Sequence, residues 1–246
     1  MDQFNLSSAP RHRNLVLNAL EVSGLHDFRN DLAPIALESG AVLYEPGRPI
    51  LQVYFPLTAV LSIVNVMKDG RTVESDTVGC ESVVGVLNAL GAPSALNRTF
   101  VQIAGDALVL DAATLKRRAQ AESAVMNLLI RFTQANLAQA HQSVACNALH
   151  PVHARLCRWL LLSHDRTGAD IVPLTQDYLA TMLGVQRTTV TQAMTVLKTA
   201  GCVDYRRGKI HIADRAGLEA LACECYAVGQ AHLHWVVGEA VVKAPA

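Results

Sequence analysis

Short apolar runs separated by turn signals fill the chain from about residue 41 to residue 110. The apolar runs are residues 41–44, 59–66, 72–73, 100–103 and 107–110. Asp69-Gly70 lies between two β-forming runs, which is a typical hairpin signal. Turn signals about ten residues apart favour an antiparallel sandwich, roll or jelly roll over an alternating α/β sheet. Residues 81–90 fit either a short helix or an irregular loop.

The pattern changes at Ala112, and helical periodicity continues to Leu149 without a Gly or a Pro. The recurring inward positions are Leu115, Met126, Leu129, Phe132 or Thr133, Asn136, Ala140 and Val144. We expect one long helix whose narrow stripe forms a homodimer seam; the alternative is a helix that packs only on its own domain. Pro151 ends this pattern.

The segment after Pro151 predicts a helix over 152–164, a turn at 165–168, and then two short helices, a hairpin and a terminal helix. Three apolar side chains give the first short helix its inward face: Leu179, Met182 and Leu183. Gly184 follows where a tight helix–helix turn needs positive φ. Val190, Met194 and Leu197 give the second helix its inward face. The pattern is therefore typical of a helix-turn-helix.

The outward face of the second helix carries no acid, although surface helices usually do. Its members are Arg187, Thr188, Thr191, Gln192, Thr195 and Lys198. Arg can bind guanine O6 and N7, Gln can pair with adenine, and Thr can contact thymine or phosphate. Arg187 lies at the helix start, where recognition helices reach base edges. Gln186 is a weaker N-cap than Ser, Thr or Asp would be.

A basic hairpin tip follows directly, with Arg206, Arg207 and Lys209 around Gly208, and suits phosphate contact beside a groove. The alternative is a plain surface helix pair with a solvated hairpin. The candidate DNA-binding residues are Thr175, Gln186, Arg187, Thr188, Thr191, Gln192, Lys198, Arg206, Arg207 and Lys209.

Charge and composition narrow the function classes. Arg plus Lys equals Asp plus Glu at 21 each, but residues 151–215 hold nine Arg and Lys against five Asp, a local charge of +4. A polar N-terminus without a signal-peptide core, and the lack of an 18-residue apolar run, predict a soluble cytoplasmic protein without a membrane partner. The sequence shows no catalytic motif, so we do not expect an enzyme.

In this order of elements the chain resembles the family of the cAMP receptor protein and the fumarate–nitrate reduction regulator. The resemblance implies an α+β fold: an N-terminal antiparallel β-roll (1–111) like a cyclic-nucleotide-binding domain, a long dimerisation helix (112–149) and a C-terminal winged helix-turn-helix (150–246). It also implies a homodimeric transcription regulator on a near-palindromic double-stranded DNA operator, with RNA polymerase as a candidate partner. The family consensus has Arg, Glu and Arg on the recognition helix. Arg187 matches, whereas Thr188 and Gln192 depart, so the operator should differ from the usual one.

The family's cyclic-nucleotide chemistry is poorly matched. Gly85-Val86-Leu87 replaces a Gly-Glu-Leu motif, and Val86 cannot accept a hydrogen bond from a ribose hydroxyl. Arg98 follows as a phosphate candidate, while Ala140 and His141 take the places of a Thr-Ser pair. The candidate ligand positions are therefore Gly85, Arg98, Ala140 and His141. Because the family's polar partners are missing, we expect no cAMP dependence and no cofactor. The alternatives are a regulator that responds to a cyclic nucleotide or dinucleotide, and a ligand-binding regulator that acts through protein partners.

The cysteines predict no metal centre at this stage. Residues 1–40 contain no Cys, which excludes the N-terminal iron–sulfur cluster of the family's redox members. Cys223 and Cys225, with His232 and His234, could supply four zinc ligands. Residues two apart in a continuous helix point about 200° apart, however, so ordinary helix packing is expected.

Overall fold

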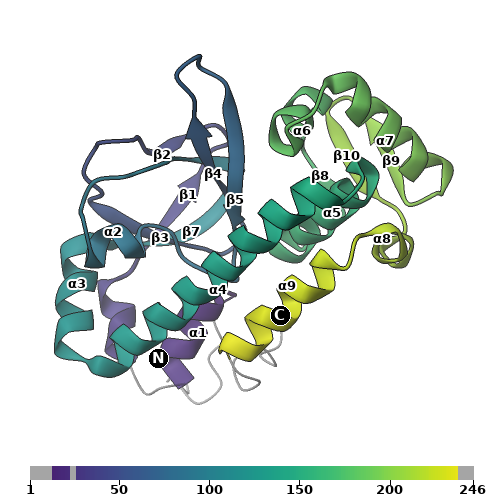
Figure 1. The fold of residues 1–246 in the computed structure, drawn as a ribbon. Coiled ribbons are helices and arrows are strands. Elements are labelled where there is room, and N and C mark those ends of the chain that lie inside the picture. The colour runs from purple at the N-terminus through teal and green to yellow at the C-terminus, as the bar shows by residue number, and fades with distance from the viewer. Residues whose placement is uncertain (1–12, 23–25, 238–246) are drawn as a thin grey trace, which may run out of the picture.

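Two β-sheets form the N-terminal part of the computed structural model, which describes residues 13–22 and 26–237 (Figure 1). One sheet has the order β1-β7-β3, from Ala33–Leu37, Gly105–Asp111 and Gln52–Pro56. The other has the order β2-β6-β4-β5, from Val42–Tyr44, Arg98–Ile103, Val60–Val66 and Thr72–Val78. All neighbours are antiparallel, which confirms the predicted class. The Asp69-Gly70 hairpin joins β4 to β5, with φ 85° at Gly70.

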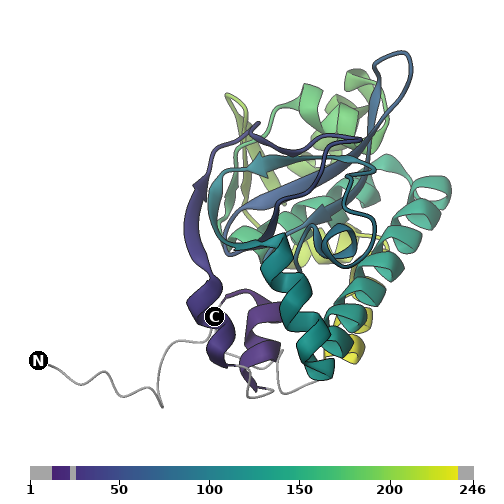
Figure 2. The same cartoon turned by 90° about the vertical axis from the view of Figure 1, so that its left-hand side faces the viewer.

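The interior of this β-roll is filled by its own side chains. Leu61, Val101 and Ala59 are fully buried between the sheets. Tyr44 and Tyr54 lie beside each other with ring centroids 6.0 Å apart. The Tyr44 hydroxyl donates to the carbonyl of Gln52 at 2.9 Å, so this buried polar group is paired. Seen from the side of the roll, the strands lie in front of the C-terminal helices (Figure 2).

The single helix expected over 112–149 is divided. α3 (Ala112–Ala121) and α4 (Ser123–Leu149) meet at Glu122, which is extended with φ −127° and ψ 104°. The sequence has no Gly or Pro at this bend. Both helices bury side chains in the same core, and the bend lets α3 and α4 each face that core. That core also includes residues of α1 (Leu15–Val22) and α2 (Val86–Leu90), and η2 (His26–Asp31) adds Phe28 to it.

The segment 81–90, for which the sequence left a helix and a loop open, contains both. Residues 81–85 are irregular, and the short helix α2 follows.

Most of the stripe predicted as a dimer seam packs on its own domain. Leu115, Leu129 and Phe132 are each 1 % exposed or less, within the core that also holds Phe55 and Leu110. Periodicity shows that a helix has an apolar face but does not show what covers it. The predicted stripe was therefore wrong for these positions.

The C-terminal part is a winged helix. α5 (Val152–Thr167) leads through β8 (Ile171–Val172) to α6 (Gln176–Leu183) and α7 (Arg187–Thr199), and then come β9 (Val203–Arg206), β10 (Lys209–Ile212) and α8 (Arg215–Leu221). α5 is three residues longer than predicted and ends at Gly168, whose φ is 67°. The small sheet has the order β8-β10-β9.

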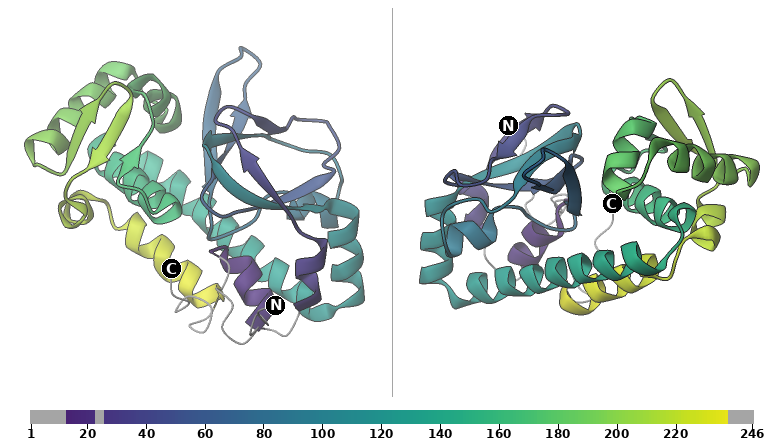
Figure 3. Two further views of the ribbon diagram at one scale, coloured as in Figure 1. Left: turned by 180° about the vertical axis from the view of Figure 1, so that it is seen from behind. Right: turned by 45° about the horizontal axis from the view of Figure 1, so that its top comes forward.

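The last helix, α9 (Cys225–Val237), runs back along α4 (Figures 1 and 3). Gly229 permits this close approach, because a Cβ there would lie 2.7 Å from Oε1 of Gln139 on α4. Within the residues described, no helix is both long and apolar enough to cross a membrane.

The β-roll and the winged helix share a polar contact. Arg166 of α5 is buried, and it binds Glu81 at 2.7 Å and donates to the carbonyl of Thr77 at 2.7 Å. Glu74 of β5 accepts hydrogen bonds from Ser62 at 2.6 Å and from Gln102 at 2.9 Å. Burial raises the pKa of Glu74 to about 8, although those hydrogen bonds lower it. The contacts of Arg166 therefore join α5 to the β-roll, whereas the hydrogen bonds to Glu74 come from within the roll.

Candidate nucleic-acid interface

The helix-turn-helix is shaped by local signals. Thr175 caps α6 by accepting the N–H of Tyr178 at 3.2 Å. Gly184 ends α6 in the left-handed region with φ 64°. Val190, Met194 and Leu197 of α7 are buried, as their spacing predicted, against a core that includes Leu179. This packing fixes which side of α7 faces outward.

All the predicted outward side chains of α7 are exposed. These are Arg187, Thr188, Thr191, Gln192, Thr195 and Lys198. Gln186 precedes them as the N-cap and makes no capping hydrogen bond with its side chain, which leaves its amide available. None of these six side chains is acidic, so they offer hydroxyl, amide and cationic groups, and the apolar Val196 of α7 is exposed beside them.

Two of the cations have acidic partners from neighbouring elements, which sequence reasoning missed. Arg187 lies 3.3 Å from Asp177 of α6, and Lys198 lies 2.9 Å from Asp204 of β9. The hydrogen bond from Lys198 holds the pKa of Asp204 below its usual range. All four side chains are more than half exposed, so water and salt screen both pairs and neither adds much to stability. They can be exchanged for a phosphate or a base at little cost.

The hairpin places its cations at the tip. Arg206 pairs with Lys209 across β9 and β10, and Arg207 and Gly208 form the turn. Arg207 has φ 48°, a conformation that Gly or Asn adopts more readily. Arg206, Arg207 and Lys209 are all exposed.

The structure brings the wing close to the start of α6. A Cβ added to Gly208 would lie 3.6 Å from the methyl group of Thr175. Thr175 therefore belongs beside the wing tip, while the other candidates follow α7. The role of each of the ten residues in binding stays a prediction.

The four candidate ligand positions do not form a site in this structure. Gly85 is the left-handed N-cap of α2, and a Cβ there would collide with the Tyr44 hydroxyl. Arg98 forms a two-point ion pair with Glu45 at 3.0 Å. His141 is exposed on α4, and Ala140 is half-buried. A pocket of about 370 Å³ lies instead between β5 and helices α4, α5 and α9, and neither Gly85 nor Arg98 lines it.

The cysteine–histidine group suggested by the C-terminal spacing also changes membership. His232 and His234 are exposed on α9, and His234 bonds the carbonyl of Gln230. Cys223 and Cys225 are buried and lie beside Cys146 and His150, at the end of α4.

Comparison with known proteins identifies the C-terminal domain and the fold. Residues 154–221 match the family model of the Crp-like helix-turn-helix domain. FixK2 from Bradyrhizobium japonicum is similar with a TM-score of 0.66 and 20 % identity, over 78 % of this chain and 98 % of FixK2. TTHB099, a CRP-family transcriptional regulator from Thermus thermophilus, gives 0.62 and 17 %, over 77 % and 96 % of the two chains.

A third similar structure is CLP from Xanthomonas campestris, described as a c-di-GMP responsive global regulator. It has a TM-score of 0.62 and 14 % identity, over 78 % of this chain and 99 % of CLP. No curated protein sequence matches the chain. At these identities the structural matches establish the fold, and together with the matched domain they confirm the resemblance seen in the sequence.

Proposed function

We propose that this chain, which carries a Crp-like helix-turn-helix domain on the Crp/Fnr fold, is a homodimeric, sequence-specific DNA-binding transcription regulator. The exposed face of α7 carries the proposal. It presents Arg187 at the helix start, amide and hydroxyl groups along the groove-facing side, and a basic wing beside it. Arg187 reads a guanine edge, and Arg207 contacts phosphate.

An exposed apolar row on α4 supports dimerisation. Ile130, Leu137 and Val144 are 47 %, 56 % and 70 % exposed, and they recur every seven residues. Seven residues fall only about 20° short of two helical turns, so the row stays on one side of α4. Gln139, which α9 contacts, lies two positions after a row member, about 200° round the helix. The row is therefore on the side of α4 away from this contact, where it can pair with a second copy in the manner of a coiled coil.

Regulation by cAMP is not part of this proposal. Arg98, the candidate ligand for the cyclic phosphate, is already paired with Glu45. Val86 is buried and offers no polar group to a ribose. The pocket between β5 and the helices favours a second candidate, a regulator that responds to another small molecule. Two of its lining arginines, Arg166 and Arg215, have acidic partners, and a third, Arg13, donates to the carbonyl of Arg166 at 3.1 Å. RNA polymerase remains a candidate partner of the DNA-bound dimer.

Selection of bound sequences from random duplex DNA tests the main proposal. We expect an enriched motif with two half-sites about one helical turn apart. Arg187→Ala should lose about 1–3 kcal/mol on that motif and relax the choice at one base step. Arg207→Ala should weaken all duplexes alike and lower the salt dependence of binding by about one phosphate contact.

Two results would contradict the proposal. Equal losses on motif and random duplex for Arg187→Ala would remove its base-reading role. No enriched motif, with or without nucleotides, would favour a regulator that acts through protein partners. A rise in melting temperature with cAMP or cyclic di-GMP would instead support the nucleotide-responsive alternative, because a ligand of the native state must stabilise it.

A further inference from the structure

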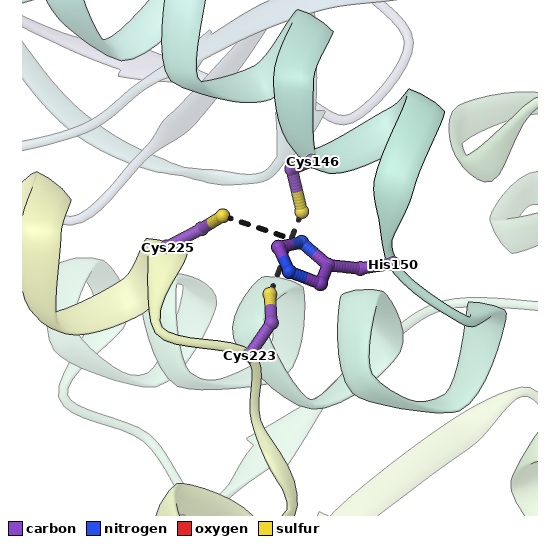
Figure 4. Close-up of side chains that lie close together, drawn as sticks. All are labelled: Cys146, His150, Cys223 and Cys225. Carbon is purple, nitrogen blue, oxygen red and sulfur yellow. Dashed lines mark hydrogen bonds between the residues drawn. The ribbon is translucent and has the colours of Figure 1, made fainter.

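Four metal-ligating side chains converge where α4 ends and α9 begins (Figure 4). They are Cys146 and His150 from the end of α4, and Cys223 and Cys225 from the start of α9. Their ligand atoms all lie within 4.8 Å of one another. The three cysteines are buried, and the histidine is half-buried.

Local structure explains why these residues meet. Cys146 and His150 are four residues apart, so both are on one side of the last turn of α4. His150 itself is extended, with φ −104° and ψ 145°, because Pro151 follows and disfavours a helical residue before it. Cys223 lies in the connector after α8, and Cys225 is the first residue of α9. The two are therefore not in one continuous helix. Their side chains need not point about 200° apart, as the sequence spacing had suggested.

The distances fit a tetrahedral ion. Sγ of Cys146 is 3.5 Å from Sγ of Cys223, and Sγ of Cys225 is 3.5 Å from Nδ1 of His150. A tetrahedron with bonds of about 2.3 Å to sulfur and about 2.0 Å to nitrogen has edges of about 3.8 Å between sulfurs and about 3.5 Å from sulfur to nitrogen. Small side-chain adjustments would bring all four ligands to bonding distance.

The surrounding groups are those that metal ligands need. Nε2 of His150 lies 3.2 Å from a carboxylate oxygen of Glu224, which leaves Nδ1 to face the sulfurs. A carboxylate that orients a metal-binding histidine in this way is a common arrangement around zinc. The amide of Gln142 donates to Sγ of Cys225 at 2.9 Å. Simple packing of apolar thiols would require neither of these two contacts.

The local charge is also complementary. Three thiolates and one neutral imidazole around Zn²⁺ carry a net charge of −1. Arg155 and Arg158, in the first turns of α5, are buried, and each has an Nε atom without a hydrogen-bond partner among the described residues. Burial lowers the pKa of Arg155, and the nearby Cys146 and Cys223 act against this. These two cations would offset the charge of the loaded site.

We propose that Cys146, His150, Cys223 and Cys225 form a structural Zn²⁺ site that fastens the C-terminal helix to the dimer helix. All four ligands come from the protein, which is typical of structural rather than catalytic zinc. The site lies at the junction of α4 and α5, where the winged helix begins. The ion therefore holds α9 along α4 and fixes the direction in which the chain enters the DNA-binding domain. The proposal does not depend on DNA binding.

Metal analysis of the full-length protein, purified reduced and without chelator, tests the proposal. We expect about one zinc per chain, and replacement by Co²⁺ should give the visible bands of a tetrahedral thiolate site. Cys223→Ser together with Cys225→Ser should abolish both signals. Glu224→Gln changes an exposed side chain and keeps all four ligands. Because it removes the carboxylate that orients His150, it should weaken zinc binding by about 10–100-fold.

Matched controls separate this site from the ligands that spacing alone suggested. His232→Ala, His234→Ala and Cys80→Ser should keep a full zinc content. If the double cysteine variant does not fold, Glu224→Gln and chelation of the unmodified protein still test the site, because metal removal should lower the melting temperature of the unmodified chain. Less than about one tenth of a zinc per chain with no tetrahedral cobalt spectrum, or full zinc in the folded double variant, would overturn the proposal.

Discussion

Leu137→Ala should weaken the proposed homodimer, because Leu137 is the central member of the exposed row on α4. Its side chain is 56 % exposed in the single chain, between Ile130 and Val144. The inward apolar residues of α4 pack in the core of its own domain, whereas more than half of Leu137 stays in contact with solvent in the single chain. Alanine preserves the helix, because it has the highest helix propensity.

The magnitude follows from the exposed fraction. The change removes three carbon groups, which contribute about 0.8 kcal/mol each when fully buried. Scaled by the exposed fraction of 56 %, the loss is about 1.3 kcal/mol per copy, or about 2.7 kcal/mol for a symmetric dimer. This corresponds to a dimer dissociation constant raised about a hundredfold. A cavity in the seam would add to the loss.

Sedimentation equilibrium over a range of concentrations measures this constant directly. Leu96→Ala is the matched control, because Leu96 is 83 % exposed on the β-roll, away from α4. Circular dichroism should show the same helix content in both variants. A dimer constant unchanged by Leu137→Ala, or changed equally by Leu96→Ala, would refute the reasoning about the seam.

Three other predictions concern the carboxyl group of Glu74, the contact that Arg166 makes between the domains, and the left-handed turn at Gly184. Glu74→Gln should reduce the pH dependence of the free energy of unfolding. Folded Glu74 keeps a proton that the unfolded chain releases above pH 4.5, so Glu74 lowers that free energy by up to about 4 kcal/mol between pH 5 and about 8, while Asp76, whose pKa burial raises to about 7, keeps its own contribution in the variant. The same pH dependence of urea unfolding in the wild type and the variant would contradict this. Arg166→Met should cost up to about 3 kcal/mol, because the half-buried carboxylate of Glu81 loses its cation, whereas exposed Arg48→Met should cost under about 0.5 kcal/mol. Equal denaturation midpoints of the two variants would contradict this. Gly184→Ala should cost about 1–2 kcal/mol from its left-handed φ of 64° alone, since the space around it is open, and an unchanged melting temperature would argue against this strain.

Local patterns were sufficient to predict the outward face of α7. The inward residues of α7, Val190, Met194 and Leu197, follow from their spacing, and the outward set follows once they are placed. The left-handed Gly184 and the basic hairpin tip are equally local features. Each depends on residues within about one or two helical turns, so the sequence carries the whole signal.

Faces that meet distant parts of the chain were harder to assign. The periodicity of α4 predicted an apolar stripe, but Leu129 and Phe132 are buried in the core that α4 shares with α1, α2, α3 and strand residues, and the exposed row is centred on Leu137. The bend at Glu122 had no Gly or Pro to announce it, because it arises from two helices packing into one core. Asp177 and Asp204 likewise reach Arg187 and Lys198 only through packing of neighbouring elements.

The sequence by itself determined the order of the elements, the antiparallel roll, the helix-turn-helix and the chemical character of its outward face. Only the tertiary structure decided which ligands share a site: it placed Cys146 beside Cys223, 77 residues further along the chain, and left His232 and His234 in solvent. The physical reason is that side-chain periodicity is set by backbone geometry over a few residues. The meeting of α9 with α4 is set by the burial of surfaces that are far apart in sequence.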